Sequence, residues 1–400
     1  MRMFPNTVAG VIEALETSFG MDIYADKVVE RLLRRNKKWG SRDRSFVAEH
    51  TYEIVRNWRL LWWLLDEEPS TKRKTLWKLV GVYFMWRGIE LPDWPKFDSI
   101  RDFNIADRLA SLPSDVGIIE SFPEWFDEMS TAQLGDQWPA IAHELNSPAS
   151  VILRVNTAKS NRKEVLSILE QSNISAKALD NSEIAIALEG RPRLNHIEAF
   201  QNGLFEVQDA GSQEIGPYVE VEPGMNVIDA CAGAGGKTLH MANLMNNHGS
   251  IVSMDIEDRK LGELLKRAER AGIDIVETDP ISDRRIIDKY ENWADRLLLD
   301  VPCSGTGVIK RDPDTKWKLK PEHLERTIEI QRDIVDRYEK MLKPGGKLIY
   351  ATCSILKSEN EDQVREFLSH HPEYELEDEQ RVNPSEFSDG FYMARMIKKG

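Results

Sequence analysis

The amino-acid sequence predicts an α/β protein built around a doubly wound, mostly parallel sheet, with an all-helical region before it. Four short apolar runs between residues 226 and 300 each end on an acid: Asp229, Asp255, Asp279 and Asp300. These acids lie 26, 24 and 21 residues apart, about the length of one strand–helix unit. A Gly-rich turn, residues 231–238, follows the first run. Ligands of open α/β sheets bind just past the carboxyl ends of the strands, so we expect the acids and the turn to share one edge.

The N-terminal part, residues 1–143, is expected to be an all-helical domain. Apolar residues between 28 and 33 recur at helical spacing, and the runs 60–65 and 76–83 are apolar enough for buried helices. Segments of ten or more residues with few strand signals favour helices throughout this region. Nothing in it has a catalytic pattern.

A change of pattern at Asn146-Ser147-Pro148 indicates a second region, residues 144–210. Apolar and polar residues alternate from 151 to 156, which is typical of a strand, and 184–188 and 204–207 predict further strands. We expect a small α/β module. On these features a spacer between two domains and an RNA-positioning module are equally well supported.

The remaining residues, 211–400, are expected to form the main α/β domain. Five strands are predicted in it, at residues 226–230, 251–255, 275–279, 297–300 and 347–353. The fourth runs straight into Asp300-Val301-Pro302-Cys303, and the fifth ends on Cys353. An acid and two thiols at such strand ends are candidates for chemistry at one site.

Composition bounds the class of protein. The chain is 41% hydrophobic and 30% charged, which fits a folded protein with real cores. No apolar run approaches the ~18 residues that span a bilayer, and the N-terminus lacks the apolar segment of a secretion signal. Only three cysteines occur, none at the close spacing of zinc sites, so no metal is expected and a reducing, cytoplasmic location is favoured. We expect a monomer.

The net charge of −14 argues against indiscriminate nucleic-acid binding, because Lys and Arg carry the affinity for phosphate. Two basic clusters remain, at residues 31–44 and 310–320. The second directly follows the Asp300–Cys303 stretch, which makes it the better candidate for an RNA contact.

The Gly-rich turn excludes two of its three candidate ligands. A P-loop needs glycine where this chain has Cys231, and a dinucleotide-binding turn counted from Gly233 needs glycine where it has Thr238. S-adenosylmethionine remains: its amino and carboxylate groups would lie on the loop, its ribose hydroxyls on Asp255 and its adenine near Asp279. The cofactor-binding candidates are Cys231, Ala232, Gly233, Ala234, Gly235, Gly236, Lys237, Asp255, Asp279 and Asp300.

Three motifs carry a family resemblance. Residues 229–238 (Asp-Ala-Cys-Ala-Gly-Ala-Gly-Gly-Lys-Thr), 300–307 (Asp-Val-Pro-Cys-Ser-Gly-Thr-Gly) and 352–354 (Thr-Cys-Ser) resemble the RNA cytosine-5 methyltransferases of the Sun/Fmu (RsmB-type) family. The flanking segments 154–157, 208–212, 314–317, 359–361 and 389–392 also resemble that family. The helical N-terminal region resembles the NusB-like domain of bacterial members. The family's usual Ala-Pro before Gly-Gly-Lys is here Gly233-Ala234, which keeps the small residues that a close ligand needs.

The resemblance implies a Rossmann-like domain that methylates C5 of cytosine in RNA. C5 is a poor nucleophile, and a thiolate that adds to C6 activates it, which is covalent catalysis. By resemblance, Cys353 is the attacking thiol, Asp300 engages N3 of the ring, and Cys303 assists release of the enzyme–C6 bond. The target cytosine must be reached outside its stack, so a single-stranded or extruded nucleotide is expected.

The RNA partner is the least constrained expectation. Lys310 is expected to hold an RNA phosphate, with Arg311 and Arg154 as further RNA-binding candidates. The NusB-like resemblance favours ribosomal RNA. The same chemistry on transfer RNA, and a non-catalytic RNA-binding factor in ribosome assembly, remain as alternatives.

Overall fold

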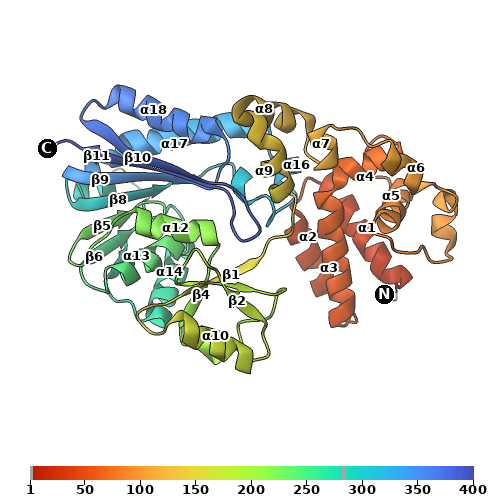
Figure 1. Cartoon of the computed structure of the whole chain (residues 1–400), viewed down its shortest axis with the longest axis horizontal. Coiled ribbons are helices and arrows are strands. Elements are labelled where there is room, and N and C mark those ends of the chain that lie inside the picture. Colours follow the sequence, from red (N-terminus) through yellow and green to blue (C-terminus); the bar gives the residue numbers. More distant parts are fainter. Residues whose placement is uncertain (1–2, 282–284) are drawn as a thin grey trace. The chain divides into compact units, whose positions relative to one another are not determined.

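The computed structural model describes residues 3–281 and 285–400 and divides the chain into two compact units. One unit is Met1–Ser147 together with Ile309–Lys320, and the other is Pro148–Val308 together with Pro321–Gly400 (Figure 1). Within the described ranges, no helix is both long enough and apolar enough to cross a membrane.

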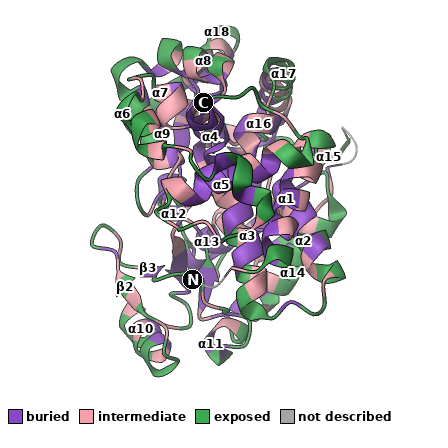
Figure 2. Ribbon diagram, turned by 90° about the vertical axis from the view of Figure 1, so that its right-hand side faces the viewer, coloured by how far each residue is buried: buried purple, intermediate pink, exposed green. Residues whose placement is uncertain are grey.

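The first unit is entirely helical in its described part, as predicted. Its helices are α1 (Pro5–Gly20), α2 (Ala25–Arg35), α3 (Ser41–Arg56), α4 (Trp58–Leu65), α5 (Arg73–Trp86), η1 (Pro95–Ile100), α6 (Ile105–Ala110), α7 (Val116–Ile119), α8 (Glu124–Leu134), η2 (Gly135–Gln137), α9 (Trp138–Leu145) and α16 (Thr315–Lys318). The apolar faces of α1 to α5 share one core, whose residues are purple in Figure 2. The likeness to NusB stays a prediction.

The segment 309–320 corrects the expected domain limits. We placed it in the main α/β domain, but it belongs to the helical unit, which also extends to Ser147 instead of 143. The physical reason is burial: the Trp317 ring packs against the helical core, and its indole N–H donates to the Val55 carbonyl at 2.7 Å. Asp314 accepts the Ala25 N–H at 2.5 Å. A segment 160 residues away in sequence from Ser147 thus completes the helical unit.

The small α/β module has the predicted strands and one more. Its elements are β1 (Val151–Val155), α10 (Arg162–Gln171), β2 (Ala176–Ala178), β3 (Ala185–Leu188), α11 (Glu198–Gln201) and β4 (Phe205–Val207). They form a four-stranded antiparallel sheet in the order β2-β3-β1-β4. The short strand β2 escaped the sequence reasoning because three residues are too few to show alternation.

The main domain is the predicted doubly wound sheet. Its elements are α12 (Ala210–Tyr218), β5 (Asn226–Asp229), α13 (Gly236–Leu244), β6 (Ser250–Ser253), α14 (Asp258–Ala271), β7 (Val276–Thr278), α15 (Arg285–Lys289), β8 (Ala294–Asp300), η3 (Thr306–Val308), α17 (Pro321–Tyr338), η4 (Glu339–Met341), β9 (Leu342–Thr352), η5 (Lys357–Glu359), α18 (Glu361–His370), β10 (Tyr374–Val382) and β11 (Phe391–Lys398). The strand order is β10-β11-β9-β8-β5-β6-β7. The strands β7, β6, β5, β8 and β9 run parallel, and β10 and β11 add an antiparallel edge.

Both faces of this sheet are covered, which explains why its central strands are apolar without alternation. Leu297 and Leu299 of β8 face one core with α17 and α18, whereas Leu298 faces the other core with α12, α13 and α14. Figure 1 shows these two helical layers on opposite sides of the sheet. Because β5 to β9 run parallel, the polar residues at their carboxyl ends lie at one edge of the sheet.

Candidate active site

The two thiols expected at separate strand ends lie together. Strands β8 and β9 are parallel neighbours in which Asp300 pairs with Ala351, so both leave the sheet at the same edge. Cys303 follows β8 and Cys353 follows β9, and their Sγ atoms are 3.2 Å apart. Both side chains are half-buried. The two strand ends therefore lie together, and their role as one catalytic site stays a prediction.

The approach of the two loops depends on Gly307. Its N–H donates to the Cys353 carbonyl at 2.9 Å, and its own carbonyl accepts the Gly390 N–H at 2.8 Å. A Cβ on Gly307 would lie 2.1 Å from the Gly390 oxygen and 2.8 Å from the Cys353 oxygen, closer than real Cβ atoms come to other atoms. Glycine is required at this position because two backbones pass within contact distance.

An ion pair links the first thiol's strand to the Gly-rich turn. Lys237 Nζ donates to Asp300 Oδ2 at 2.6 Å, and both side chains are largely shielded from solvent. Burial alone would lower the pKa of Lys237, but the Asp300 carboxylate and the nearby Cys353 sulfur raise it, so the amine stays charged. The sequence assigns Lys237 only to the cofactor, and its pairing with Asp300 was not foreseen.

The two thiols are not electrically equivalent. The contact with Cys353 and then burial raise the pKa of the Cys303 thiol, and the charges of Cys353 and Glu359 add to this. Cys303 therefore keeps its proton, and the two sulfurs share a hydrogen bond in which either can be the donor. Cys231 differs from both: burial raises its pKa first and the neighbouring carboxylates add to it, so it remains a thiol lining the turn.

The Gly-rich turn has the geometry for a close ligand. Gly233 and Gly235 adopt φ values of +55° and +84°, which favour glycine, and no atom lies within 4 Å of a Cβ placed on Gly233. Gly235 is the N-cap of α13 and makes no side-chain cap bond, so this helix begins at the turn, and a helix N-terminus favours a negative group. The Gly233 N–H donates to Asp255 Oδ2 at 2.9 Å, which ties the turn to the end of the next strand.

Three carboxylates at the same edge, Asp229, Asp255 and Asp279, could accept hydrogen bonds from the amino and hydroxyl groups of a ligand. Asp229 is 1% exposed; Thr238 donates to its Oδ2 at 2.7 Å, and its Oδ1 has no partner. Burial raises the pKa of Asp229 to about 7. Asp255 lies beyond β6 and Asp279 beyond β7, where Asp279 accepts from Lys289 at 2.6 Å and from Tyr290 at 3.0 Å. The roles of Asp255 and Asp279 toward particular ligand atoms stay predictions.

Arg154 differs from the expected RNA-binding residue. It is 1% exposed, and its guanidinium donates to Gln208 and, at 2.7 Å, to the Gly236 carbonyl of the cofactor turn. Binding RNA phosphate requires an exposed cation, so Arg154 supports the turn from the small module instead. Glu206 of the same module pairs with Arg267 of α14 at 2.9 Å. The module is thus packed against the cofactor side of the main domain.

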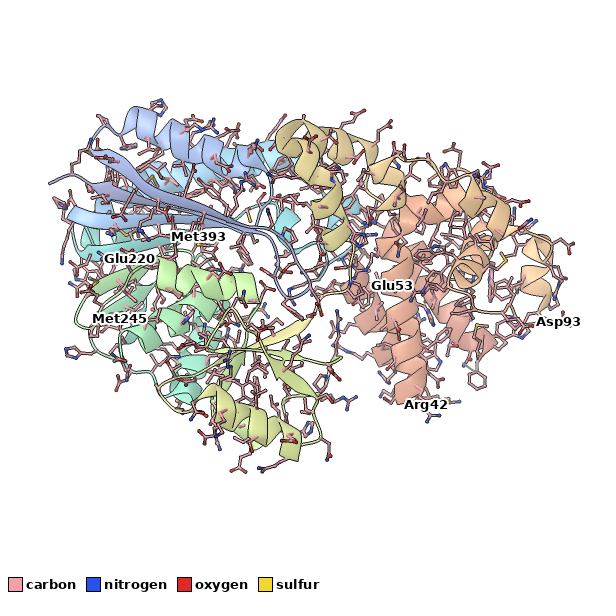
Figure 3. The ribbon with its side chains drawn as sticks, viewed as in Figure 1. Arg42, Glu53, Asp93, Glu220, Met245 and Met393 are labelled. Atoms are coloured by element: carbon pink, nitrogen blue, oxygen red, sulfur yellow. The ribbon has the colours of Figure 1, made fainter. Side chains whose placement is uncertain are left out.

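Lys310 also differs from expectation. It is 1% exposed, so its ammonium does not lie at the surface where an RNA phosphate would bind. Its backbone carbonyl accepts from Arg56 at 3.1 Å. Glu53, labelled on α3 in Figure 3, bonds Arg56 at 3.2 Å and holds it there. Arg311 is half-buried, and its RNA contact stays a prediction.

Lys316 and Lys318 of this basic cluster are interior as well, whereas Lys320 is exposed. Lys316 is fully buried, and it donates to Asn146 at 2.8 Å and to the Glu120 carbonyl at 3.2 Å. Lys318 donates to the Ser18 carbonyl at 2.7 Å. A run of lysines looks the same in the sequence whether the lysines are solvated or donate to buried carbonyls. Only the structure distinguishes the two cases.

Two polar residues beside the thiols could not be found from the sequence, because they are distant from the thiols along the chain. Glu359 and Gln331 lie beside the thiol loops, yet they come from η5 and α17, and only the family-like Glu359-Asn360-Glu361 motif pointed to one of them. The two interact with each other at 3.1 Å.

Comparison with known proteins agrees with this geometry. Residues 218–397 match the family model described as 16S rRNA methyltransferase RsmB/F, and residues 122–195 match the RsmF/B-like ferredoxin-like domain. A Bacillus subtilis protein named "Probable ribosomal RNA small subunit methyltransferase B" is 33% identical over 335 residues, covering 78% of this chain and 72% of its own length.

Two solved structures share the fold. One is the crystal structure of PH0851, which aligns over 100% of both chains with a TM-score of 0.76 at 25% identity. The other, NSun6 from Pyrococcus horikoshii with SFG, has a TM-score of 0.64 at 21% identity and covers 70% of this chain and 100% of its own. With this fold, cofactor turn and pair of thiols, the chain belongs to the RsmB/F family of methyltransferases, whose methyl donor is S-adenosylmethionine.

Proposed function

We propose that this protein methylates C5 of a cytosine in ribosomal RNA through a covalent bond between Cys353 and C6 of the ring. The observation that carries the proposal is the pair of thiols 3.2 Å apart, next to the Lys237–Asp300 ion pair and the cofactor turn. A single buried cysteine would fit many methyltransferases. Two thiols in contact at the ends of adjacent strands fit a reaction that needs one sulfur to form a bond and one to help break it.

The first step uses the charge arrangement around Cys353. Its thiolate adds to C6, which moves electron density to C5 and charge toward N3 and O2 of the ring. The Lys237–Asp300 pair lies beside the thiols, so Asp300 could engage the ring edge and the Lys237 ammonium could offset that charge. S-adenosylmethionine would supply an electrophilic methyl group: the C5 electron pair would form the new carbon–carbon bond as the methyl–sulfur bond breaks and S-adenosylhomocysteine leaves.

The second step uses Cys303. Its raised pKa comes first from the contact with Cys353 and also from the Cys353 charge. Once Cys353 is a neutral thioether, that charge is gone and Cys303 can ionise more easily. The Cys303 sulfur then takes the C5 proton, the electron pair restores the C5–C6 double bond, and the Cys353–C6 bond breaks to regenerate the thiolate.

The ribosomal substrate is supported by the relatives. The Bacillus subtilis protein carries the name of a small-subunit ribosomal RNA methyltransferase, and the matched family model carries a 16S rRNA name. An unmodified small-subunit RNA is therefore the first substrate to test, and bulk transfer RNA is the matched alternative. Most of that RNA is paired, so the target cytosine must be exposed or extruded.

The test is methyl transfer from labelled S-adenosylmethionine into transcribed small-subunit RNA, followed by nucleoside analysis. We expect label only in 5-methylcytidine, and no label with Cys353→Ala. Cys303→Ala should accumulate a protein–RNA adduct that survives denaturation. Label in another nucleoside, or full activity of Cys353→Ala, would contradict the proposal.

A further inference from the structure

A buried carboxylate, Glu359, connects the two loops that carry the thiols. Glu359 is 0% exposed and lies at the end of η5, just before α18. Its Oε1 accepts the Ser304 N–H at 2.7 Å, and its Oε2 accepts the Ser304 hydroxyl at 2.5 Å. The same Oε2 accepts the Ser354 hydroxyl at 2.5 Å. Ser304 follows Cys303 and Ser354 follows Cys353, so one side chain holds the residue next to each thiol.

Neighbouring contacts make this connection rigid. The Glu359 carbonyl accepts from Tyr350 of β9 at 2.6 Å, which fixes its backbone to the strand that ends at Cys353. Gln331 of α17 donates to Oε1 at 3.1 Å and to the Pro302 carbonyl at 3.0 Å. The carboxylate is therefore held from the strand and from the helix behind it.

Asn360 completes the support of the second loop. Its side chain accepts from Thr352 at 2.5 Å and donates to the Ser354 carbonyl at 2.9 Å, so it binds both residues that flank Cys353. These two side-chain bonds of Asn360 support the Cys353 loop, whereas the Glu359 side chain reaches both loops. Glu359 thus adds a side-chain link between the loops to the Gly307 backbone bond and to the Thr306–Ser354 hydrogen bond at 2.9 Å.

A glutamate at this buried position is not explained by packing alone. Within the described residues, Glu359 forms no ion pair, and its donors are a backbone N–H, two hydroxyls and an amide. Burying an anion among neutral donors costs more free energy than burying a neutral side chain with the same bonds. The position of this carboxyl between the two thiol loops therefore calls for a role beyond packing.

We propose that Glu359 is a positioning residue for the two-thiol reaction, holding Cys303 and Cys353 at the separation that lets one sulfur attack while the other serves release. This inference rests on the proposed function and adds the residue that sets its geometry. Its charge adds a second effect, because Glu359 contributes to the raised pKa of Cys303 and so helps Cys303 keep its proton while Cys353 attacks.

The experiment compares Glu359→Gln and Glu359→Ala with Glu339→Gln. The glutamine keeps the shape and the Oε1 acceptor but removes the charge, and alanine removes every side-chain contact while the backbone bond to Tyr350 remains. Glu339 is also a buried carboxylate, 8% exposed, but it bonds Tyr374 and Lys398 on another part of the sheet. It controls for the loss of a buried charge in general.

The first measurement needs neither RNA nor methyl transfer. Alkylation of Cys303 by iodoacetamide is followed against pH by peptide mass spectrometry. In Glu359→Gln we expect the titration to move to lower pH, since a nearby negative charge has been removed. Glu339→Gln should leave it unchanged. An unchanged titration in Glu359→Gln overturns the electrostatic part of the inference.

The second measurement is kcat with the RNA substrate, beside the dissociation constant of S-adenosylmethionine. A displacement of about 1 Å at a reacting centre costs on the order of 10²-fold in rate. We therefore expect Glu359→Ala to lower kcat by about 10²-fold, Glu359→Gln to recover part of it, and cofactor affinity to stay unchanged in both. Ser304→Ala and Ser354→Ala, which each remove one donor, should give smaller losses than Glu359→Ala.

The outcomes separate the two proposals. If the native protein makes 5-methylcytidine but kcat is unaffected in both Glu359 variants, the positioning role is wrong and the proposed function stands. If the Cys303 titration shifts as expected but the native protein makes no 5-methylcytidine, the proposed function is wrong. Loss of cofactor binding in Glu359→Ala would mean a general structural role and would also overturn the inference.

Discussion

Replacing Gly307 by alanine tests whether the meeting of the two thiol loops controls the reaction. The new Cβ would lie 2.1 Å from the Gly390 oxygen and 2.8 Å from the Cys353 oxygen. Both are backbone atoms, so neither can rotate away as a side chain would. Relief to an ordinary contact above 3 Å requires the loops to separate by about 1 Å.

This separation has two expected costs. Inserting a methyl group into such a close approach costs about 1–3 kcal/mol in the free energy of unfolding. It also weakens the Gly307 N–H bond to the Cys353 carbonyl, which is 2.9 Å long in the native chain. A 1 Å error in the position of Cys353 relative to Cys303 should lower the methyl-transfer rate by about 10²-fold.

The assay is single-turnover methyl transfer, with urea unfolding and cofactor binding measured on the same samples. Gly262→Ala is the matched control, because Gly262 lies inside α14 and nothing lies within 4 Å of its added Cβ. That variant should be stabilised by about 0.5–1 kcal/mol, since alanine loses less entropy in a helix, with an unchanged rate. A Gly307→Ala protein with native rate and native stability would refute the reasoning.

The other predictions concern the helical unit, pH and oxidation. Trp317→Ala removes a ring from the helical core and the indole bond to Val55, so the free energy of unfolding should fall by about 3–5 kcal/mol in urea; Trp94→Ala, a partly buried tryptophan on the same core, is the comparison, and an equal or smaller loss for Trp317 contradicts the role of segment 309–320. The pKa of Asp229 is raised from 3.8 to about 7, so the folded state binds the carboxyl proton more tightly than the unfolded state does. The contribution of this proton to the free energy of unfolding is therefore complete below pH 4 and is lost as the pH rises to 7. Asp229→Asn should remove that slope, worth at most about 4 kcal/mol, from urea titrations of the cofactor-free protein, and an unchanged slope would show that Asp229 ionises normally. Hydrogen peroxide should join Cys303 to Cys353, whose sulfurs are 3.2 Å apart, with two thiols losing two protons and two electrons as peroxide becomes water. Activity should be lost and recovered with a thiol reductant, and peptide mapping that finds the bond at Cys231 instead would contradict the expected pairing.

The sequence was sufficient for the parts of the site whose signal is local. A strand ending in Asp300-Val301-Pro302-Cys303 and another ending in Cys353 predict one shared edge, because parallel neighbours end together. The Gly-rich turn is likewise a local pattern, and its positive φ values at Gly233 and Gly235 follow from the residue type.

The parts that could not be predicted depend on contacts distant in sequence. Lys310 and Arg154 look like surface cations, yet both are buried. For Arg154 the partners are Gln208 and the Gly236 carbonyl, which lie 54 and 82 residues away in the sequence. Nothing between residues 309 and 320 shows that this stretch completes a helical unit whose other residues end at Ser147. The pairing of Lys237 with Asp300 spans 63 residues and appears only when β5 and β8 lie side by side.

The central claim is that Cys353 forms the bond to C6 and Cys303 does not. The direct measurement is peptide mass spectrometry of the protein after reaction with RNA containing 5-fluorocytidine, which has no proton at C5 to release and so keeps the adduct intact. The account predicts a methylated nucleotide attached to the peptide that contains Cys353, in the native protein and in Cys303→Ala, and none in Cys353→Ala. Attachment to the Cys303 peptide would contradict it.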